Sequence, residues 1–501
     1  MNGVSGEWKF LFVQDGGHVR LPVWGHVPLS LGARKVIEHP DFVRLQRVNQ
    51  LLFVEYAFPG ATHTRFEHCI GTYHLARLMV RSLLANPDNA LTAADSPGLT
   101  PLEARVFLAA ALLHDIGHYP CAHLMDHLPF RGGNGRFLFQ SHEERAREYL
   151  DPHRRGGLAQ VLRDYWEIPD PALVADAIAP PENAAAEDNL PARLLSGIVD
   201  PDKMDYLMRD AAGCGVPYGH IDSERLIESL VLDNGPSGRR LAITEKGIAP
   251  LESLIFCKYM MFRHIYWHHT ARIASAMFGR FVQDAVDANV IEPAWFYELS
   301  DDALQQRLCA PEVVGAFPAG ELMPALVARR LYKRAVTLYP EPGVGEAEFR
   351  LGPEQIADLA KLYRDPERRR AAEQLACAIL ARREGISLAG HEVLLDIPEP
   401  DSVFDVEDFE TLRVLVSSQR NREHRFFVPF NDYGFSQMKS SFAQEFERYS
   451  RKVRVVCRAD LRGAVLSAWN ELWTAIRAAA ETPPHVGPCL RIGQPPGKSA
   501  P

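Results

Sequence analysis

An apolar stretch that ends in a histidine and an aspartate constrains this chain most. From Leu102 it reads Leu-Glu-Ala-Arg-Val-Phe-Leu-Ala-Ala-Ala-Leu-Leu, and His114 and Asp115 follow directly. Because apolar residues cover nearly every side of such a helix, we expect it to be buried. An unpaired buried aspartate is very costly, and the negative end of the helix dipole adds to the cost. The sequence therefore predicts a positive group at Asp115, and a metal ion shared with His114 would supply it.

Length and composition indicate a water-soluble globular protein. The 501 residues suggest about three domains, and contents of 47% hydrophobic and 24% charged residues are ordinary. Apolar stretches stay shorter than the roughly 18 residues of a membrane span, so we expect no membrane association. The N-terminus shows no signal-peptide pattern, and the eight cysteines are scattered without Cys-x-x-Cys spacing, which predicts free thiols and a cytoplasmic location. A net charge of −9 argues against a general nucleic-acid coat but leaves a local basic groove open.

The pattern of the chain predicts mainly helices, with strands in two places. Short strands and turns are expected over 8–31, and helices over 36–50, 64–85 and 250–286. Asn-Gly-Pro-Ser-Gly at 234–238 predicts a hairpin between 230–232 and 241–244. β-like runs follow Gly385, at 393–397, 412–416, 425–428 and 452–456, before a last helix over 460–480. We therefore expect a catalytic domain over 1–290, a helical extension over 291–385, a smaller α+β lobe over 386–481 and a disordered tail over 482–501.

Histidines gather in one part of the chain. Eight of the 19 lie between His63 and His142. Together, His68, His114, Asp115 and Asp202 would form a site of two histidines and two carboxylates. Such a site leaves coordination positions for water and a phosphate oxygen, and it suits one divalent ion, Mn, Fe or Mg. Each element alone has an ordinary explanation, such as a helix-surface histidine at His68 or an ion-pair network over 199–210.

Four stretches in this order resemble the HD-domain superfamily of metal-dependent phosphohydrolases, and within it the deoxynucleoside triphosphate (dNTP) triphosphohydrolases. They are Gln50 to His68, His114 to His123 with Asp126, Asp202 to Asp210, and Tyr266 to His269. The chain is similar to the branch that in animals carries an additional SAM domain, although we expect no SAM domain before the catalytic region here. The resemblance covers about 8–290 and extends weakly to the end, where 453–457 and the following helix look like a regulatory lobe.

The resemblance implies the roles of the site residues. The implied metal ligands are His68, His114, Asp115 and Asp202. The implied catalytic residues are His118, His123, Asp126 and His142. The implied substrate-binding residues are Arg65 and Lys203 for the triphosphate, Gln50, Tyr206 and Asp210 for the deoxyribose, and Tyr266 near the base. For Tyr206 and Tyr266, packing in the core is the alternative explanation.

The chemistry of the reaction agrees with these roles. Water must attack the α-phosphorus, and the departing O5′ must be protonated; a histidine titrates near neutral pH and can move both protons. We assign the proton for O5′ to His123. His118, set against Asp126 and His142, would hold or deprotonate the water, because a carboxylate behind a histidine fixes its tautomer.

We therefore predict a mainly α HD fold with a smaller α+β lobe that hydrolyses dNTPs to deoxynucleoside and triphosphate. One alternative is an HD-type phosphatase acting on another nucleotide, and another is a non-catalytic nucleotide-binding regulator. Two-metal phosphodiesterases of the superfamily often carry lysine where this chain has His118, which favours the dNTPase branch. The sequence does not determine the preferred base or the native metal.

The resemblance also implies a homo-oligomer, a dimer or tetramer, with a nucleotide activator site. The guanine-reading positions of that site fall at Glu38, Val43 and Gln46, where the SAM-bearing branch has Asp, Gln and Arg. Val43 has no hydrogen-bonding group and Gln46 has no positive charge. Because charge-assisted bonds contribute about 1.5–3 kcal/mol each, GTP should bind poorly there. We predict an oligomer that does not need GTP and is either activated by a dNTP or constitutively active.

Overall fold

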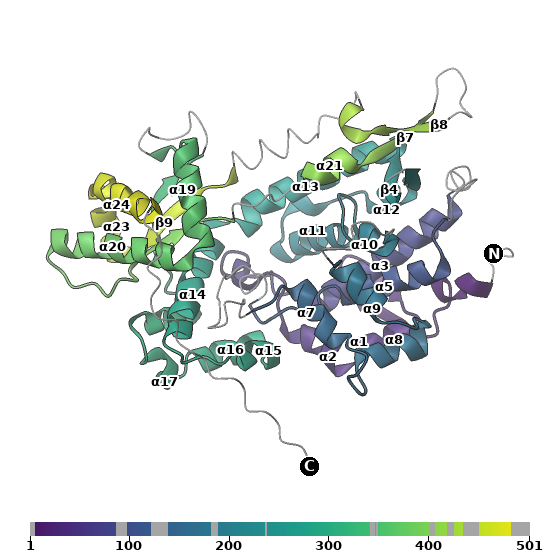
Figure 1. Ribbon diagram of the computed structural model, residues 1–501, viewed down its shortest axis with the longest axis horizontal. Coiled ribbons are helices and arrows are strands. Elements are labelled where there is room, and N and C mark those ends of the chain that lie inside the picture. Colours follow the sequence, from purple (N-terminus) through teal and green to yellow (C-terminus); the bar gives the residue numbers. More distant parts are fainter. Residues whose placement is uncertain are drawn as a thin grey trace, which may run out of the picture. The chain divides into compact units, whose positions relative to one another are not determined.

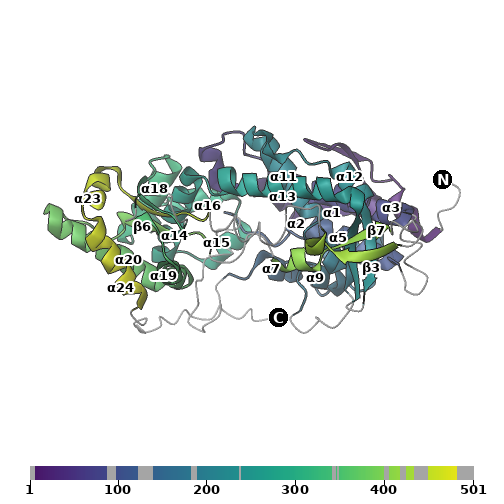
Figure 2. The ribbon, with the colours of Figure 1, turned by 90° about the horizontal axis from the view of Figure 1, so that it is seen from above.

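The computed structural model describes most of the chain as helices with small sheets (Figure 1). The described residues are 6–86, 98–121, 139–181, 189–235, 238–340, 346, 349–399, 406–417, 425–433 and 450–481. Two compact units are present, which are viewed from above in Figure 2. Unit 1 comprises 1–122, 141–271 and 402–450; unit 2 comprises 123–140, 272–401 and 451–501. The predicted mainly α fold class is confirmed.

Unit 1 begins with short elements. A 3₁₀ turn (Gly6–Leu11) precedes the antiparallel strands β1 (His18–Leu21) and β2 (Gly25–Pro28), then α1 (Leu31–Ile37), α2 (Pro40–Val43) and 3₁₀ turns at Arg44–Arg47 and Leu52–Tyr56. The single helix predicted over 36–50 is therefore wrong. Pro40 has no N–H to continue α1, and the side chain of His39 instead accepts a bond from the Asp41 N–H and starts a new helix.

Three helices form the centre of unit 1: α3 (Arg65–Ala85), α5 (Pro101–Leu113) and α11 (Pro201–Cys214). α3 packs against both of the others. Thr100 and Glu103 close a capping box at the start of α5, and from Val106 to Leu113 every side chain of this helix is buried. The predicted buried helix is thus confirmed, and its burial holds the residues that follow it in the interior.

The rest of unit 1 surrounds these helices. Its helices are α7 (His142–Tyr149), α8 (Leu158–Trp166), α9 (Ala172–Ile178), α10 (Leu190–Leu195), α12 (Ser223–Glu228), α13 (Ile248–Met261) and α21 (Val406–Thr411). A π-helical turn, Phe262–Tyr266, extends α13. The sheet has the order β3-β4-β7-β8, with strands Leu230–Gly235, Gly238–Thr244, Arg413–Ser417 and Arg425–Pro429. β3 and β4 form the predicted hairpin, whereas β4 and β7 run parallel.

Unit 2 has its own sheet and core. The antiparallel sheet β5-β9-β6 consists of Lys333–Leu338, Val453–Cys457 and Val393–Asp396. The helices are α14 (His269–Asp287), α15 (Pro293–Glu298), α16 (Asp301–Leu308), α17 (Pro311–Val314), α18 (Leu322–Val327), α19 (Pro353–Arg364), α20 (Pro366–Glu384), α23 (Arg462–Ser467) and α24 (Trp469–Glu481).

The purely helical character predicted for 291–385 is wrong, because β5 lies within it and pairs with β9. The β-like runs after Gly385 do form strands, but these strands belong to two different sheets. The predicted domain boundaries stay a prediction. Among the described residues, no helix is long and apolar enough to cross a membrane, and the seven described cysteines are free thiols.

Candidate metal centre

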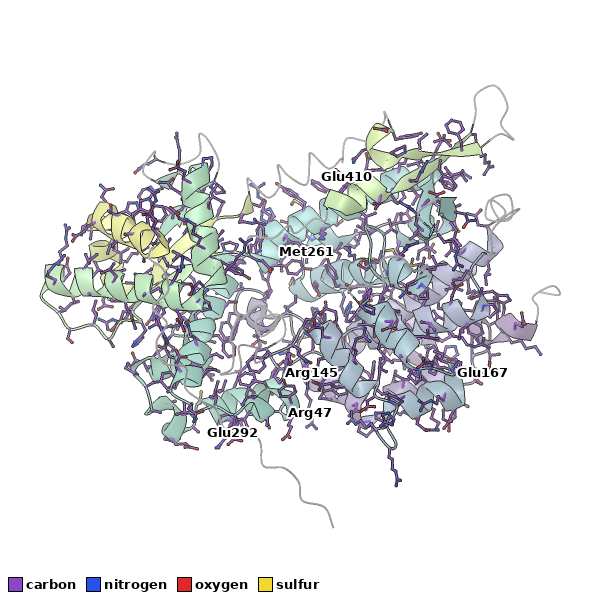
Figure 3. All side chains as sticks on the ribbon, in the orientation of Figure 1. Arg47, Arg145, Glu167, Met261, Glu292 and Glu410 are labelled. Atoms are coloured by element: carbon purple, nitrogen blue, oxygen red, sulfur yellow. The ribbon has the colours of Figure 1, made fainter. Side chains whose placement is uncertain are left out.

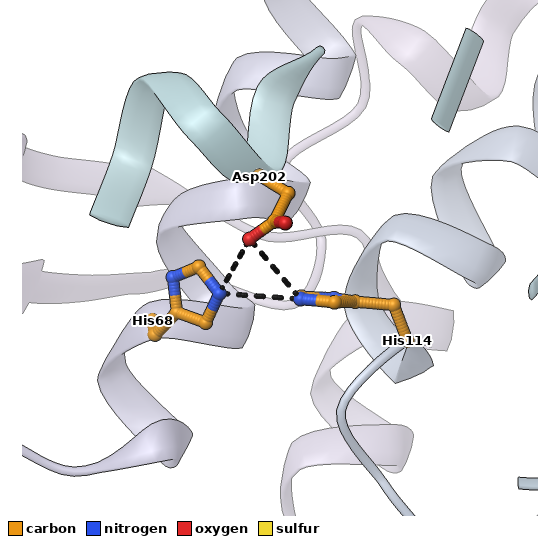
Figure 4. Close-up of side chains that lie close together, drawn as sticks. All are labelled: His68, His114 and Asp202. Atoms are coloured by element: carbon orange, nitrogen blue, oxygen red, sulfur yellow. Dashed lines mark hydrogen bonds and ion pairs between the residues drawn. The ribbon is translucent and has the colours of Figure 1, made fainter. Parts of the chain in front are cut away.

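Three segments of unit 1 bring His68, His114 and Asp202 together (Figure 4). His68 lies in the first turn of α3, His114 directly follows α5, and Asp202 lies in the first turn of α11. The His68 Nε2 atom is 3.2 Å from the His114 Nε2 atom and 2.9 Å from an Asp202 carboxylate oxygen. The His114 Nε2 atom is 3.5 Å from the same oxygen. Two nitrogens and one oxygen therefore point at a common position.

The other ring nitrogen of each histidine is already used. The His114 Nδ1 atom lies 3.0 Å from the Ala111 carbonyl oxygen, which can only accept, so Nδ1 must carry the proton. The His68 Nδ1 atom lies 2.8 Å from the Asp205 carboxylate, which fixes its proton in the same way. In the neutral rings both Nε2 atoms are then lone-pair acceptors. Three acceptors face one another, and this arrangement requires a cation between them.

The donor set fits a divalent metal ion. Imidazole Nε2 with an oriented Nδ1–H and a carboxylate oxygen are common metal ligands in proteins. Without a metal, a proton takes the place of the cation: burial alone would lower the pKa of His68, but its hydrogen bonds with Asp202 and Asp205 raise it to about 10. The Asp202 side chain is 34% exposed, so an ion and a substrate oxygen can reach this side of the group.

Asp115 lies beside this group but has a partner of its own. Its carboxylate is 3.5 Å from the His114 Nε2 atom and 3.8 Å from the His68 Nε2 atom. The Arg65 guanidinium donates to it at 2.5 Å, with both side chains buried. Although burial would raise the pKa of Asp115, Arg65 and the neighbouring histidines hold it well below its usual value. The positive group that the sequence predicts at Asp115 is therefore supplied in part by Arg65.

A second group is formed by Asp115, His118 and His142. The His118 Nε2 atom is 3.1 Å from Asp115 Oδ1, and the His118 and His142 rings stack with centroids 3.7 Å apart. Glu143 lies 3.1 Å from the Nε2 atom of His142. Burial, Arg65 and His142 lower the pKa of His118 well below its usual value. His118 is therefore held as a neutral imidazole.

Two arginines, the half-buried Arg44 and the buried Arg145, hold the turn that carries the histidines. Arg44 donates to the carbonyl oxygens of Ile116 and His118, and Arg145 (labelled in Figure 3) donates to that of Gly117. A Cβ atom on Gly117 would lie 1.9 Å from the His142 carbonyl oxygen, so only glycine lets α7 approach this closely. The turn after α5 is thus fixed through its backbone, which sets the direction of both histidines.

The predicted sugar-binding residues form a third polar group in unit 1. Asp210 accepts a bond from the Tyr266 hydroxyl at 2.6 Å, and His63 contacts its other oxygen at 2.7 Å. The Tyr206 and Tyr266 rings meet edge to face with centroids 6.3 Å apart. Gln50 is buried, and its Oε1 atom has no hydrogen-bond partner among the described residues. The group offers an unused acceptor and aromatic faces.

Other predicted residues are placed differently or lie outside the described residues. The Lys203 ammonium lies 2.5 Å from Asp200 and 2.7 Å from the Gly197 carbonyl oxygen, so it is engaged with its own helix start. His123 and Asp126 lie outside the described residues. The activator positions Glu38, Val43 and Gln46 are exposed.

Sequence reasoning assigned no role to several residues that shape the site. Asp205 and His63 contact predicted site residues, Arg209 contacts Asp205, and Arg145 contacts the turn after α5. The first three lie within the stretches that carry the resemblance, but no role was assigned to them. The spacing of Asp202, Asp205 and Arg209, which places all three on neighbouring faces of α11, was a further signal for Asp205 and Arg209.

Comparison with known proteins gives two family matches. A model of the HD domain matches residues 65–167, and a model of the HD-associated region matches residues 221–408. His68, His114, Asp115, His118 and His142 lie within the first match, whereas Asp202 lies between the two.

Two relatives and one solved structure illustrate the range of similarity. An uncharacterized protein of Methanocaldococcus jannaschii is 29% identical over 60% of this chain and 56% of its own length. The deoxynucleoside triphosphate triphosphohydrolase SAMHD1 of Gallus gallus is 27% identical over 53% of this chain and 44% of its own. The chain thus spans about half the length of these relatives. A crystal structure of a phosphohydrolase from Bacteroides thetaiotaomicron, 20% identical, shares the fold with a TM-score of 0.61 over 88% of this chain and 99% of its own.

Proposed function

We propose that this chain is an HD-domain phosphohydrolase that hydrolyses dNTPs to deoxynucleoside and triphosphate. The observation that carries the proposal is the convergence of His68 Nε2, His114 Nε2 and an Asp202 oxygen beside a neutral, buried His118. Such a pairing joins a cation site to a proton acceptor, which is what attack of water on a phosphate ester requires.

The metal group would be held by His68, His114 and Asp202, with Asp115 beside them. A divalent ion bound there polarises a phosphate oxygen and lowers the pKa of a water. Mn, Fe and Mg all suit this donor set. The ligands themselves need no rearrangement to receive the ion, because Asp205 and Ala111 already fix both imidazole tautomers.

The phosphates would also be held by Arg65. Its Nη1 atom is bonded to Asp115, whereas Nε and Nη2 are buried and have no hydrogen-bond partner among the described residues. Unpaired buried donors are costly, and the oxygens of a phosphate would satisfy them. Lys203 could bind the triphosphate only after breaking its contact with Asp200, so we assign it a smaller part than Arg65 in holding the phosphates.

Proton transfer falls to the histidines. His118 is kept neutral and would take a proton from the attacking water, while His142, stacked on it, would hold its ring in place. For His123 the prediction that it protonates the departing O5′ remains, and Asp126 stays the predicted carboxylate partner of His118.

The sugar would be read by Gln50, Tyr206 and Asp210, with Tyr266 near the base. The unused Gln50 Oε1 atom accepts a hydroxyl proton, and Asp210 is held in place from both sides by His63 and Tyr266. The similarity to SAMHD1, which is named a dNTP triphosphohydrolase, supports this choice of substrate. We expect dNTPs to be cleaved far faster than NTPs.

Product analysis distinguishes this proposal from its alternatives. The metal-loaded protein is incubated with each dNTP and NTP, and the products are identified by chromatography and phosphorus NMR. Triphosphate and deoxynucleoside support the proposal. Inorganic phosphate would indicate a phosphatase acting on another bond, equal rates on dATP and ATP would refute the sugar selection, and binding without turnover would indicate a regulator.

We also propose a homo-oligomer that does not require GTP. Glu38 forms an ion pair with Arg34 at 2.6 Å, and neither Val43 nor Gln46 supplies a positive charge. Turnover of a single dNTP is measured with and without GTP, beside the mass in solution. Strict dependence on GTP, or an active monomer, would contradict the proposal.

A further inference from the structure

Asp205 gathers an unusual number of hydrogen-bond donors behind the metal group. Its carboxylate is fully buried. His68 contacts one oxygen through Nδ1 at 2.8 Å, and Arg209 bridges both oxygens with two bonds of 2.8 Å. The Trp24 indole N–H donates to Oδ1 at 2.5 Å. Both oxygens are thus held twice, so the carboxylate cannot rotate without breaking bonds.

Trp24 reaches Asp205 from a distant part of the chain. It lies in the turn between β1 and β2, 181 residues before Asp205. Val23, directly before it, has φ of 73°, a left-handed conformation that a β-branched residue rarely adopts. Such a conformation persists only where its surroundings hold it, and here the indole bond to Asp205 is such a restraint. The hairpin therefore delivers one particular side chain to the buried carboxylate.

α3 leaves room for this arrangement at Gly71. A Cβ atom there would lie 1.8 Å from Asp205 Oδ1 and 2.5 Å from an Arg209 nitrogen. Gly71 is three residues from His68 on the same helix. The glycine that makes room for the Asp205 carboxylate and the histidine that this carboxylate orients therefore lie on one turn of α3.

We propose that Asp205 and Trp24 are positioning residues of the metal site, in which Asp205 fixes the Nδ1 proton and ring direction of His68 and Trp24 fixes Asp205. Neither residue touches the ion. Without the indole, Oδ1 keeps a single partner and the carboxylate can turn away from the plane of the His68 ring. The His68 Nε2 lone pair is then aimed less well at the ion, and binding weakens. This proposal does not depend on the identity of the substrate.

The test measures binding of Mn²⁺ alone to the full-length chain after removal of metal, by titration calorimetry. Removing a partner behind a ligand typically weakens metal binding by about 10–100-fold, and we expect this range for Asp205→Asn because an amide cannot accept from all three donors. Trp24→Phe keeps an aromatic ring but loses the indole N–H, and we expect a decrease of about 3–10-fold, below that range because Arg209 remains. Trp8→Phe is the matched control, since Trp8 stacks on Phe10, and its affinity should equal that of the wild type.

A second readout separates positioning from a purely structural role. The melting temperature of each variant is measured without metal and at saturating Mn²⁺. A positioning role predicts that Trp24→Phe loses part of the increase caused by Mn²⁺. If Asp205→Asn does not fold, the Mn²⁺ affinity and the melting temperatures of Trp24→Phe distinguish the two roles. Wild-type Mn²⁺ affinity in Trp24→Phe would overturn the proposal, as would a wild-type chain that shows no saturable Mn²⁺ binding.

Discussion

Two carboxylates, one in each unit, meet their positive partners in opposite ways. Asp396, at the end of β6 in unit 2, lies between Arg272 and Arg454, with contacts of 2.6 and 2.8 Å, and its side chain is 1% exposed. Asp202 in unit 1 lies between His68 and His114 and is 34% exposed. Arginine is always charged, so Asp396 is neutralised permanently from within the chain. Imidazoles become neutral when they lose a proton, so Asp202 needs a cation from outside.

From this difference we expect a structural role for Asp396 and metal binding for Asp202. The arrangement around Asp396 is closed: no proton or ion has to enter, and the group joins α14, β6 and β9. The arrangement around Asp202 can exchange a proton for a metal ion, and its exposed side leaves a path for substrate. We therefore expect mutations in the two places to separate cleanly, with loss of metal in one case and loss of stability in the other.

The largest effect is expected for Asp202→Ala. Removal of this carboxylate takes away both a charge and a ligand, so metal content should fall below detection and activity should be lost. Metal is measured by mass spectrometry on purified protein whose fold is checked by circular dichroism. Asp222→Ala, a helix N-cap that belongs to neither group, serves as the control and should keep its metal. A well-folded Asp202→Ala chain with full metal content would refute the ligand assignment.

His118→Ala should separate chemistry from metal binding. Loss of a general base or acid typically lowers turnover by about 10²–10⁴-fold, while the ion stays bound by His68, His114 and Asp202. Turnover and metal content are measured on the same sample. His153→Ala, which changes an exposed histidine in neither histidine group, should keep turnover near the wild type. If His118→Ala loses its metal, His118 is instead a ligand or a support.

Asp396→Ala should destabilise the fold without removing the metal. It leaves two guanidiniums without their acceptor, and breaking a buried pair in this way costs about 3–5 kcal/mol. Denaturant unfolding followed by circular dichroism measures the loss, and metal content should equal that of the wild type. An unchanged unfolding midpoint would contradict the account of unit 2.

The smallest expected effect is the pH dependence of the stabilisation that Asp396 gains from its two arginines. Burial raises the pKa of Asp396, but Arg272 and Arg454 outweigh this and lower it below the usual 3.8. Its stabilisation is therefore fully present above about pH 4 and is lost as the pH falls through the lowered pKa. The melting-temperature difference between wild type and Asp396→Asn should stay constant from pH 7 to 5 and shrink below pH 4. A melting-temperature difference that grows in acid would show that the fold raises the pKa of Asp396 instead of lowering it.

The parts of the site that could be predicted are those written as local patterns. The apolar run of α5 locates His114 and Asp115 in the interior, and the helix over 64–85 places His68. The helix predicted over 36–50 overlooked a local signal, because Pro40 cannot lie in the interior of a helix and starts a new one after the cap at His39. β5 was not predicted, because this strand forms by pairing five of its residues with β9, which lies more than a hundred residues later in the chain.

The residues behind the ligands could not be predicted, because the fold alone makes them neighbours. Trp24 and Asp205 are 181 residues apart, and His63 meets Asp210 over 147 residues. A tryptophan in a turn or an aspartate on a helix has no feature that marks such a contact. Arg65 was assigned to phosphate, and its bond to Asp115 emerges only when α3 and α5 pack together.

The most direct test of the central claim is a crystal structure of the Mn²⁺-loaded chain, with anomalous scattering recorded at the manganese edge. The account predicts one strong anomalous peak in unit 1, within about 2.0–2.3 Å of His68 Nε2, His114 Nε2 and an Asp202 oxygen. A map without a peak among these three atoms, or with the ion bound elsewhere, would contradict it.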